Sequence, residues 1–144
     1  MKSSILLFVL AVAGCAAESS PDESAVEADV LSTPAGTLWS DGGFGGSAFA
    51  ITAPRNGAEI EGNLPADFDN IASSLTVRAK CTIELFTGPD SSGLSSGGYV
   101  GNVNQLPPGI DNEVSSYRAF CIPTCTTGKH WCGPDQGCTT QLCM

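Results

Sequence analysis

The residues with the clearest chemical potential are two short runs of oxygen-bearing side chains. Residues 69–74 have the sequence D-N-I-A-S-S, and residues 111–116, which begin 42 positions later, have the sequence D-N-E-V-S-S. Each run places a carboxylate, an amide carbonyl and two hydroxyls within one turn-length segment, and Ca2+ prefers oxygen ligands of this kind. Asp, Asn and Ser also gather at ordinary turns, where they cap backbone groups. Two copies at a domain-like interval favour a repeated cation-binding loop.

A second repeated pattern, of aromatic residues and glycines, precedes each run. Residues 39–46 (W-S-D-G-G-F-G-G) hold two aromatics five positions apart, with a glycine two positions further on. Residues 86–93 (F-T-G-P-D-S-S-G) repeat the frame, with Ser91 at the position of the second aromatic. Together with the D-N-x-x-S-S runs, this order resembles the signature of the βγ-crystallin family. The resemblance covers residues 36–120, fully in both runs and the first hairpin and partly in the second hairpin.

The resemblance implies two crossed Ca2+ sites. In each site the third motif residue gives its backbone carbonyl, the fifth gives its hydroxyl, and the second residue of the other motif reaches across. A hairpin carbonyl just after the first aromatic completes each set. The implied ligands are Ser40, Ile71, Ser73 and Asn112 in one site, and Thr87, Glu113, Ser115 and Asn70 in the other. Because both crossing residues are neutral asparagines, we expect modest affinity.

The elements that must position these loops are short strands, and no stretch has a helical period. Candidate strands span residues 37–40, 48–52, 59–61 and 75–78, and then 81–86, 98–101, a short piece near Gln105, and 116–120. Turn signals rich in Gly, Pro and Asp separate them. The sequence therefore predicts an all-β fold in which two Greek-key motifs form a sandwich. The predicted core comprises Leu38, Phe49, Ile51, Leu64, Phe68, Leu75, Val77, Ile83, Leu85, Leu106, Ile110 and Tyr117.

The start of the chain predicts export and anchoring. Residues 1–14 combine a lysine with a short apolar run, as in a signal peptide. Residues 12–15 (V-A-G-C) resemble the bacterial lipobox, in which cleavage leaves Cys15 as a lipid-modified N-terminus; the alternative is an ordinary secretory signal with an incidental cysteine. Residues 15–35 are acidic and poor in large apolar side chains, which predicts a disordered linker. We therefore expect a lipoprotein of the cell envelope, at the outer membrane or cell surface.

Six cysteines remain once Cys15 is assigned to lipid. They are Cys81, Cys121, Cys125, Cys132, Cys138 and Cys143. An even number in an exported protein predicts three disulfides, among 15 pairings. A bond between Cys81 and Cys121 would tie the two ends of one motif, and the other four cysteines would staple a small tail, residues 121–144. A zinc site using Cys125, His130 and Cys132 is the alternative, against which oxidation competes.

The net charge of the chain and the absence of common catalytic motifs reduce the number of functions that the sequence supports. The formal net charge is −9, which disfavours nucleic acid as a partner. The sequence lacks the common hydrolase, zinc-protease and P-loop motifs. We expect a non-catalytic Ca2+-binding module whose cation mainly stabilises the fold and whose membrane contact is the lipid anchor alone. The alternatives are a secreted proteinase inhibitor of crystallin-like fold and an adhesin or ligand-binding lipoprotein that uses the tail; a protein partner for the tail stays open.

Overall fold

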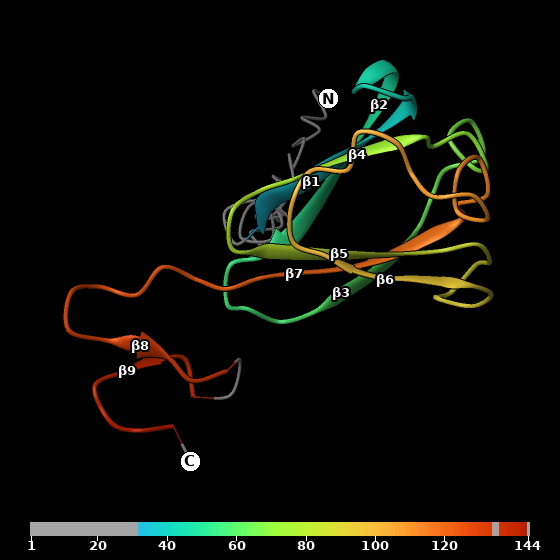
Figure 1. Cartoon of the computed structure of the whole chain (residues 1–144). Coiled ribbons are helices and arrows are strands. Elements are labelled where there is room, and N and C mark those ends of the chain that lie inside the picture. Colours follow the sequence, from blue (N-terminus) through green and yellow to red (C-terminus); the bar gives the residue numbers. More distant parts are fainter. Residues whose placement is uncertain (1–31, 134–135, 144) are drawn as a thin grey trace, which may run out of the picture.

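The computed structural model describes residues 32–133 and 136–143 (Figure 1). The predicted signal peptide, Cys15 and the predicted linker up to residue 31 lie outside the described residues. Residues 32–35, which were predicted as linker, belong to the first strand, where Ala35 is buried in the core. The described part of the chain consists of β-strands, turns and irregular segments, so it holds no helix of the length and apolarity that a membrane span needs. This all-β content is what the sequence predicts.

Seven of the strands form two antiparallel sheets that pack face to face (Figure 1). The first sheet has the order β2–β1–β4, and the second has the order β3–β7–β5–β6. The strands are β1 (Ser32–Asp41), β2 (Gly45–Pro54), β3 (Ile60–Asn63), β4 (Ser74–Val77), β5 (Cys81–Phe86), β6 (Ser95–Tyr99) and β7 (Ser116–Cys121). Strand β3 belongs to the first half of the chain but pairs with β7 of the second half. This exchange joins the two Greek keys, and the predicted sandwich is confirmed.

The strand predicted near Gln105 is the clearest local difference. In its place the chain makes a single bridge between Leu75 and Val103, with N–H···O distances of 2.9 and 2.7 Å. The next ladder bond is replaced by a side chain, because the amide of Val77 donates to Oδ1 of Asn102 at 2.8 Å. The first sheet therefore has three full strands and a one-residue bridge where a fourth strand would lie.

The core lies between the sheets and follows the predicted alternation of apolar residues. Eleven of the twelve predicted core residues are buried. The exception is Phe49, which is half-buried and packs its ring against Phe68 and Tyr117, at centroid distances of 5.7 and 6.0 Å. Small buried residues that the prediction did not include, such as Ala35, Ala72 and Ala119, complete the packing.

The tail is stapled and rests on the domain. Strands β8 (His130–Trp131) and β9 (Cys138–Thr139) pair with each other. The predicted three disulfides are present, as Cys81–Cys121, Cys125–Cys138 and Cys132–Cys143. The ring of Trp131 lies so close to Gly57, in the turn after β2, that a Cβ at Gly57 would overlap it. The contact explains why a glycine suits that turn, where φ is +78°.

Candidate metal centre

The two motif loops begin with the same backbone turn. The amide of Asp69 donates to the carbonyl of Pro65 at 2.9 Å, and the amide of Asp111 donates to the carbonyl of Pro107 at 3.0 Å. Each turn directly precedes the last strand of its half, β4 in one case and β7 in the other. The repeated sequence thus folds into a repeated local structure.

The second residue of each motif crosses to the other half through its backbone. The amide of Asn70 donates to the carbonyl of Val114, and the amide of Asn112 donates to the carbonyl of Ala72, both at 2.9 Å. Both asparagines have left-handed φ angles, 59° and 56°. Asparagine tolerates this region better than most residues with a Cβ, which gives a structural reason for its occurrence at this position in both motifs.

The side chains cross in the same sense. Oγ of Ser73 donates to Oδ1 of Asn112 at 3.3 Å, and Oγ of Ser115 donates to Oδ1 of Asn70 at 3.4 Å. Both distances lie beyond the usual O–H···O range, so these contacts are weak. In each pair a hydroxyl oxygen and an amide oxygen from opposite halves lie next to each other, and both are members of one predicted ligand set.

The hairpins bring the remaining predicted ligands to the same places. The amide of Ser73 donates to the carbonyl of Trp39 at 2.8 Å, and the amide of Ser115 donates to the carbonyl of Phe86 at 2.9 Å. Ser40 and Thr87 are the next residues along each hairpin. Their hydroxyls accept bonds from the amides of Ser47 and Leu94, both at 2.9 Å. The atoms that the prediction assigns to the metal are the backbone carbonyls of these two residues.

Ile71 and Glu113 occupy the third position of each motif. Ile71 is half-buried and Glu113 is exposed. Because the ligand predicted from each is its backbone carbonyl, a site of this kind accepts either side chain. Their difference places an additional carboxylate beside the second loop and an apolar side chain beside the first.

The last serine of each motif has a role that the sequence analysis missed. Ser74 is fully buried; its Oγ donates to the carbonyl of Asp41 at 2.6 Å and accepts from the amide of Phe44 at 3.0 Å. Ser116 acts in the same way in the second hairpin, where it accepts from the amide of Ser91 at 3.0 Å. These hydroxyls fasten each folded hairpin to the strand that follows its motif. The repeated final serine was the available signal.

The first residue of each motif tests whether a cation suits the loops. Oδ1 of Asp69 and Oδ1 of Asp111 are both buried and have no hydrogen-bond partner among the described residues. A buried carboxylate oxygen without a partner is costly, and a nearby positive charge offsets that cost. All predicted ligand atoms are oxygens, which suits Ca2+ rather than a softer metal. The donor set therefore fits a hard divalent cation.

The tail contains the only other cluster with metal-binding residue types among the described residues. The ligand atoms of His130, Cys132 and Cys143 lie within 4.8 Å of one another. Both sulfurs belong to the Cys132–Cys143 disulfide, and Cys125 is bonded to Cys138. A thiolate zinc site needs free sulfurs, so the disulfide form of the tail does not provide the alternative zinc site.

We compared the chain with known protein families, curated proteins and solved structures. No protein-family model and no curated protein matches the chain. Among solved structures, a βγ-crystallin domain from Flavobacterium johnsoniae is 20% identical, with a TM-score of 0.53 over 63% of this chain and 99% of that domain. The N-terminal domain of protein S is 21% identical, with a TM-score of 0.51 over 62% of this chain and 99% of that one.

A third similar structure is a clostrillin double mutant in complex with nickel, which is 14% identical, with a TM-score of 0.50 over 61% of this chain and 99% of that one. At these identities the likeness shows the fold. The described domain has the fold of βγ-crystallin domains, and each of the three structures leaves more than a third of this chain uncovered.

Proposed function

We propose that this chain is a non-catalytic Ca2+-binding module of the βγ-crystallin type, held at the cell envelope by a lipid on Cys15. The observation that carries the Ca2+ assignment is the pair of crossed contacts, Ser73 with Asn112 and Ser115 with Asn70. A turn-capping role would satisfy each serine and asparagine within its own loop. Instead, each of the two crossed contacts places a hydroxyl oxygen from one half beside an amide oxygen from the other half, and both are oxygens of the kind that Ca2+ binds.

The proposed sites draw their ligands from both Greek keys. Carbonyl oxygens of Ser40 and Ile71 would join the hydroxyl of Ser73 and the amide oxygen of Asn112 in the first site. Thr87, Glu113, Ser115 and Asn70 would form the second in the same way. A bound Ca2+ supplies a positive charge that the two halves share, so it would tie them together and stabilise the fold.

The expected stabilisation follows from linkage. With neutral crossing ligands, we expect dissociation constants on the order of 10 to 1,000 μM. Binding to the folded state alone would add about 2.7 kcal/mol per site to the free energy of unfolding at a hundredfold excess of free Ca2+ over the dissociation constant. This gain is a large share of the stability of a typical small domain.

The setting agrees with an exported protein. Three disulfides are typical of proteins that fold in an oxidising compartment. An acidic linker would hold the domain away from a membrane to which Cys15 is anchored. Mass spectrometry of the mature N-terminus tests the anchor: a diacylglyceryl adduct on Cys15 is the expected result, and a free Cys15 or cleavage at another residue would rule the anchor out.

Calorimetric Ca2+ titration tests the binding function. We expect two Ca2+ per chain. Ser73→Ala should weaken one site and Ser115→Ala the other, because each substitution removes one hydroxyl ligand. Ser47→Ala is the matched control, since Ser47 lies on β2 with its side chain exposed, and it should leave both sites intact. No heat of binding to the native protein would refute the function.

A further inference from the structure

A pocket lies at the end of the sandwich opposite the motif loops. Strands β1 and β5 begin at this pocket, where Thr33 and Cys81 are part of its wall. The same two strands end at the folded hairpins that contact the motif loops. The pocket has a volume of about 470 Å3, and the start of the tail, residues 122–124, forms one side of it. Its size falls in the range of small-molecule sites.

The lining of the pocket is unusual for so acidic a chain. Arg55, Arg78 and Lys80 all line it, and no Asp or Glu among residues 32–133 and 136–143 does. These three are half of the six Lys and Arg residues of the whole sequence, whose formal net charge is −9. The cations come from two places in the fold: Arg55 follows β2, and Arg78 and Lys80 lie in the short turn between β4 and β5. The fold therefore concentrates positive charge at one concave place.

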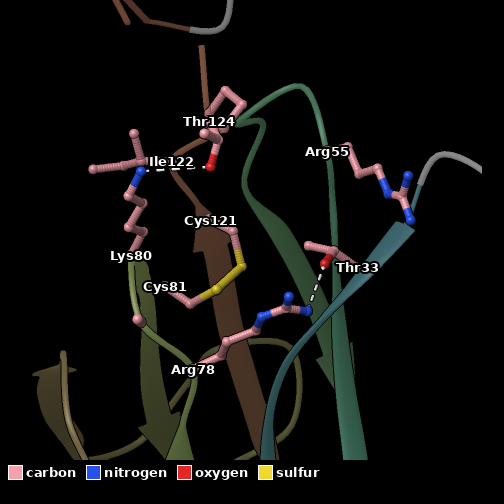
Figure 2. Close-up of a pocket in the computed structure, with 10 residues that line it drawn as sticks. Thr33, Arg55, Arg78, Lys80, Cys81, Cys121, Ile122 and Thr124 are labelled. Atoms are coloured by element: carbon pink, nitrogen blue, oxygen red, sulfur yellow. Dashed lines mark hydrogen bonds between the residues drawn. A yellow bond between two sulfur atoms is a disulfide. The ribbon is translucent and has the colours of Figure 1, made fainter. Parts of the chain in front are cut away.

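The three cations contact neutral oxygens. Arg78 donates from Nη1 to Oγ1 of Thr33 at 3.1 Å, and Lys80 donates from Nζ to Oγ1 of Thr124 at 3.4 Å (Figure 2). Arg55 donates from Nε to the carbonyl of Ser32 at 3.0 Å. An arginine has five N–H donors and a lysine three. Each cation therefore retains donors for an anionic ligand.

Arg118 shows how this chain neutralises a cation elsewhere. On the outer face of the second sheet it pairs with Glu59, Glu61 and Glu84, at N···O distances of 3.1, 2.7 and 3.7 Å. The hydrogen bond to Glu61 raises the pKa of this guanidinium. Over residues 32–133 and 136–143, the ion pairs are those of Arg118. Within that part of the chain, none of the three pocket cations has a carboxylate partner of this kind.

The backbone around the pocket is held from several sides. The amide of Arg78 donates to the carbonyl of Ala35, and the amide of Ile122 donates to the carbonyl of Lys80, both at 2.8 Å. The Cys81–Cys121 disulfide closes the floor between β5 and β7, as Figure 2 shows. Because the backbone is fixed in this way, the Cα atoms of the cationic residues stay around the pocket, and the entropy cost of ordering them when a ligand binds is lower.

We propose that this pocket binds a small ligand that carries a phosphate group. A tetrahedral phosphate offers acceptor oxygens in several directions, which suits cations that approach from two segments, and arginine recognises it through paired N–H donors. The threonine hydroxyls add neutral donors, and Ile122 and Pro123 offer an apolar wall for the part of the ligand that bears the phosphate. The ligand is a soluble phosphate ester or a phospholipid headgroup, which share this chemistry.

Two probes separate these sources. The purified exported protein is titrated at low salt with glucose 1-phosphate, and separately with dihexanoyl phosphatidylglycerol below its micelle concentration. Amide chemical shifts of residues 78–81, Ile122 and Thr124 report binding. Saturable shifts with glucose 1-phosphate identify a soluble ester as sufficient, and shifts with the lipid alone identify the headgroup. Either result supports a phosphate site, and raising the salt concentration should weaken it.

Lys80→Gln and Lys129→Gln form a matched pair, because Lys129 lies in the tail outside the pocket and both changes remove one charge. Lys80→Gln should weaken binding roughly threefold to tenfold, and Lys129→Gln less than twofold. Arg55→Gln provides a second pocket variant at an exposed position, so a folding defect in one variant leaves the test intact. Equal weakening by Lys80→Gln and Lys129→Gln would overturn the proposal.

The absence of shifts with both phosphate probes would overturn it as well. A peptide with the sequence of residues 18–29, which holds five carboxylates, tests a carboxylate ligand instead. Tighter binding of this peptide than of either phosphate probe would replace the phosphate assignment with an acidic peptide. The outcome is independent of the Ca2+ sites, which lie at the other end of the strands.

Discussion

The two halves of the domain form the same loop but support it differently. In the first hairpin a half-buried aromatic, Phe44, occupies the left-handed position at φ 63°; in the second, Ser91 takes it at φ 56°. The third strand of the first half, β3, pairs over four residues with β7, whereas its counterpart is the single Leu75–Val103 bridge. The second half has instead a disulfide between β5 and β7.

The features common to both halves show what the loop requires. Gly46 and Gly93 both have left-handed φ angles, 75° and 79°. A Cβ at Gly46 would overlap the hydroxyl of Ser40, and one at Gly93 would press on the hydroxyl of Thr87. The glycine therefore makes room for the hydroxyl that caps the hairpin. Backbone conformation and hydroxyl bonds are retained in both copies, while the aromatic residue and the strand length vary.

The largest expected effect concerns the covalent bond of the second half. Replacing Cys81 and Cys121 together with alanine should lower the free energy of unfolding by about 2–4 kcal/mol, because the bond closes a loop of 40 residues in the unfolded chain. Denaturant unfolding measures the loss. The matched control is Cys125→Ala with Cys138→Ala, whose bond lies within the tail. An equal loss of domain stability in the control would contradict the idea that the disulfide supports the second half.

The hairpin hydroxyls should come next in size. Ser74→Ala and Ser116→Ala each leave a backbone amide and a carbonyl without their partner, which costs about 1–3 kcal/mol. Ser116 donates to the carbonyl of Gly88 at 2.5 Å. We expect the larger loss for Ser116→Ala, because the second hairpin has Ser91 where the first has Phe44. Urea unfolding of the two variants side by side gives the comparison, and a larger loss for Ser74→Ala would reverse it.

A smaller expected effect tests whether the Ca2+ ligands cross between the two halves. Asn70→Asp adds a negative charge to the site built on Ser115, and it should tighten Ca2+ binding there by roughly threefold to tenfold. Asn112→Asp should do the same at the site built on Ser73. Amide chemical shifts of the two serines during Ca2+ titration distinguish the sites. Tightening within the mutated motif's own site would show that the ligands do not cross.

The sequence was sufficient for the parts of the fold that local patterns encode. The alternation of apolar residues predicted strands and eleven buried core positions, and the two repeats predicted their grouping into halves. The position of Cys81 and Cys121 at the two ends of one motif predicted their bond. Each of these inferences depends on residues that lie close in sequence, that recur at a fixed spacing, or that stand at the two ends of a unit defined by the repeat.

The parts that were missed depend on contacts between distant segments. Asn102 replaces a ladder bond of β4 with its side chain, which shortens the strand predicted near Gln105. Trp131 packs on Gly57, 74 positions earlier in the sequence. Arg55 lies in one turn and the other two pocket cations, Arg78 and Lys80, lie in another, and they meet only because the sheets bring those two turns to one end. No local pattern carries such information.

The melting temperature with and without millimolar Ca2+ tests the central claim most directly, namely that Ca2+ bound by crossed ligands stabilises the fold. For a domain of this size, about 1 kcal/mol shifts the melting temperature by about 4–8 °C. At a hundredfold excess of free Ca2+ over the dissociation constant, the gain of about 2.7 kcal/mol from one site alone predicts a rise of about 10 °C or more for the native protein. The double variant Ser73→Ala with Ser115→Ala should melt close to the native protein without Ca2+ and gain little from it. No rise in the native protein, or an equal rise in the double variant, would contradict the account.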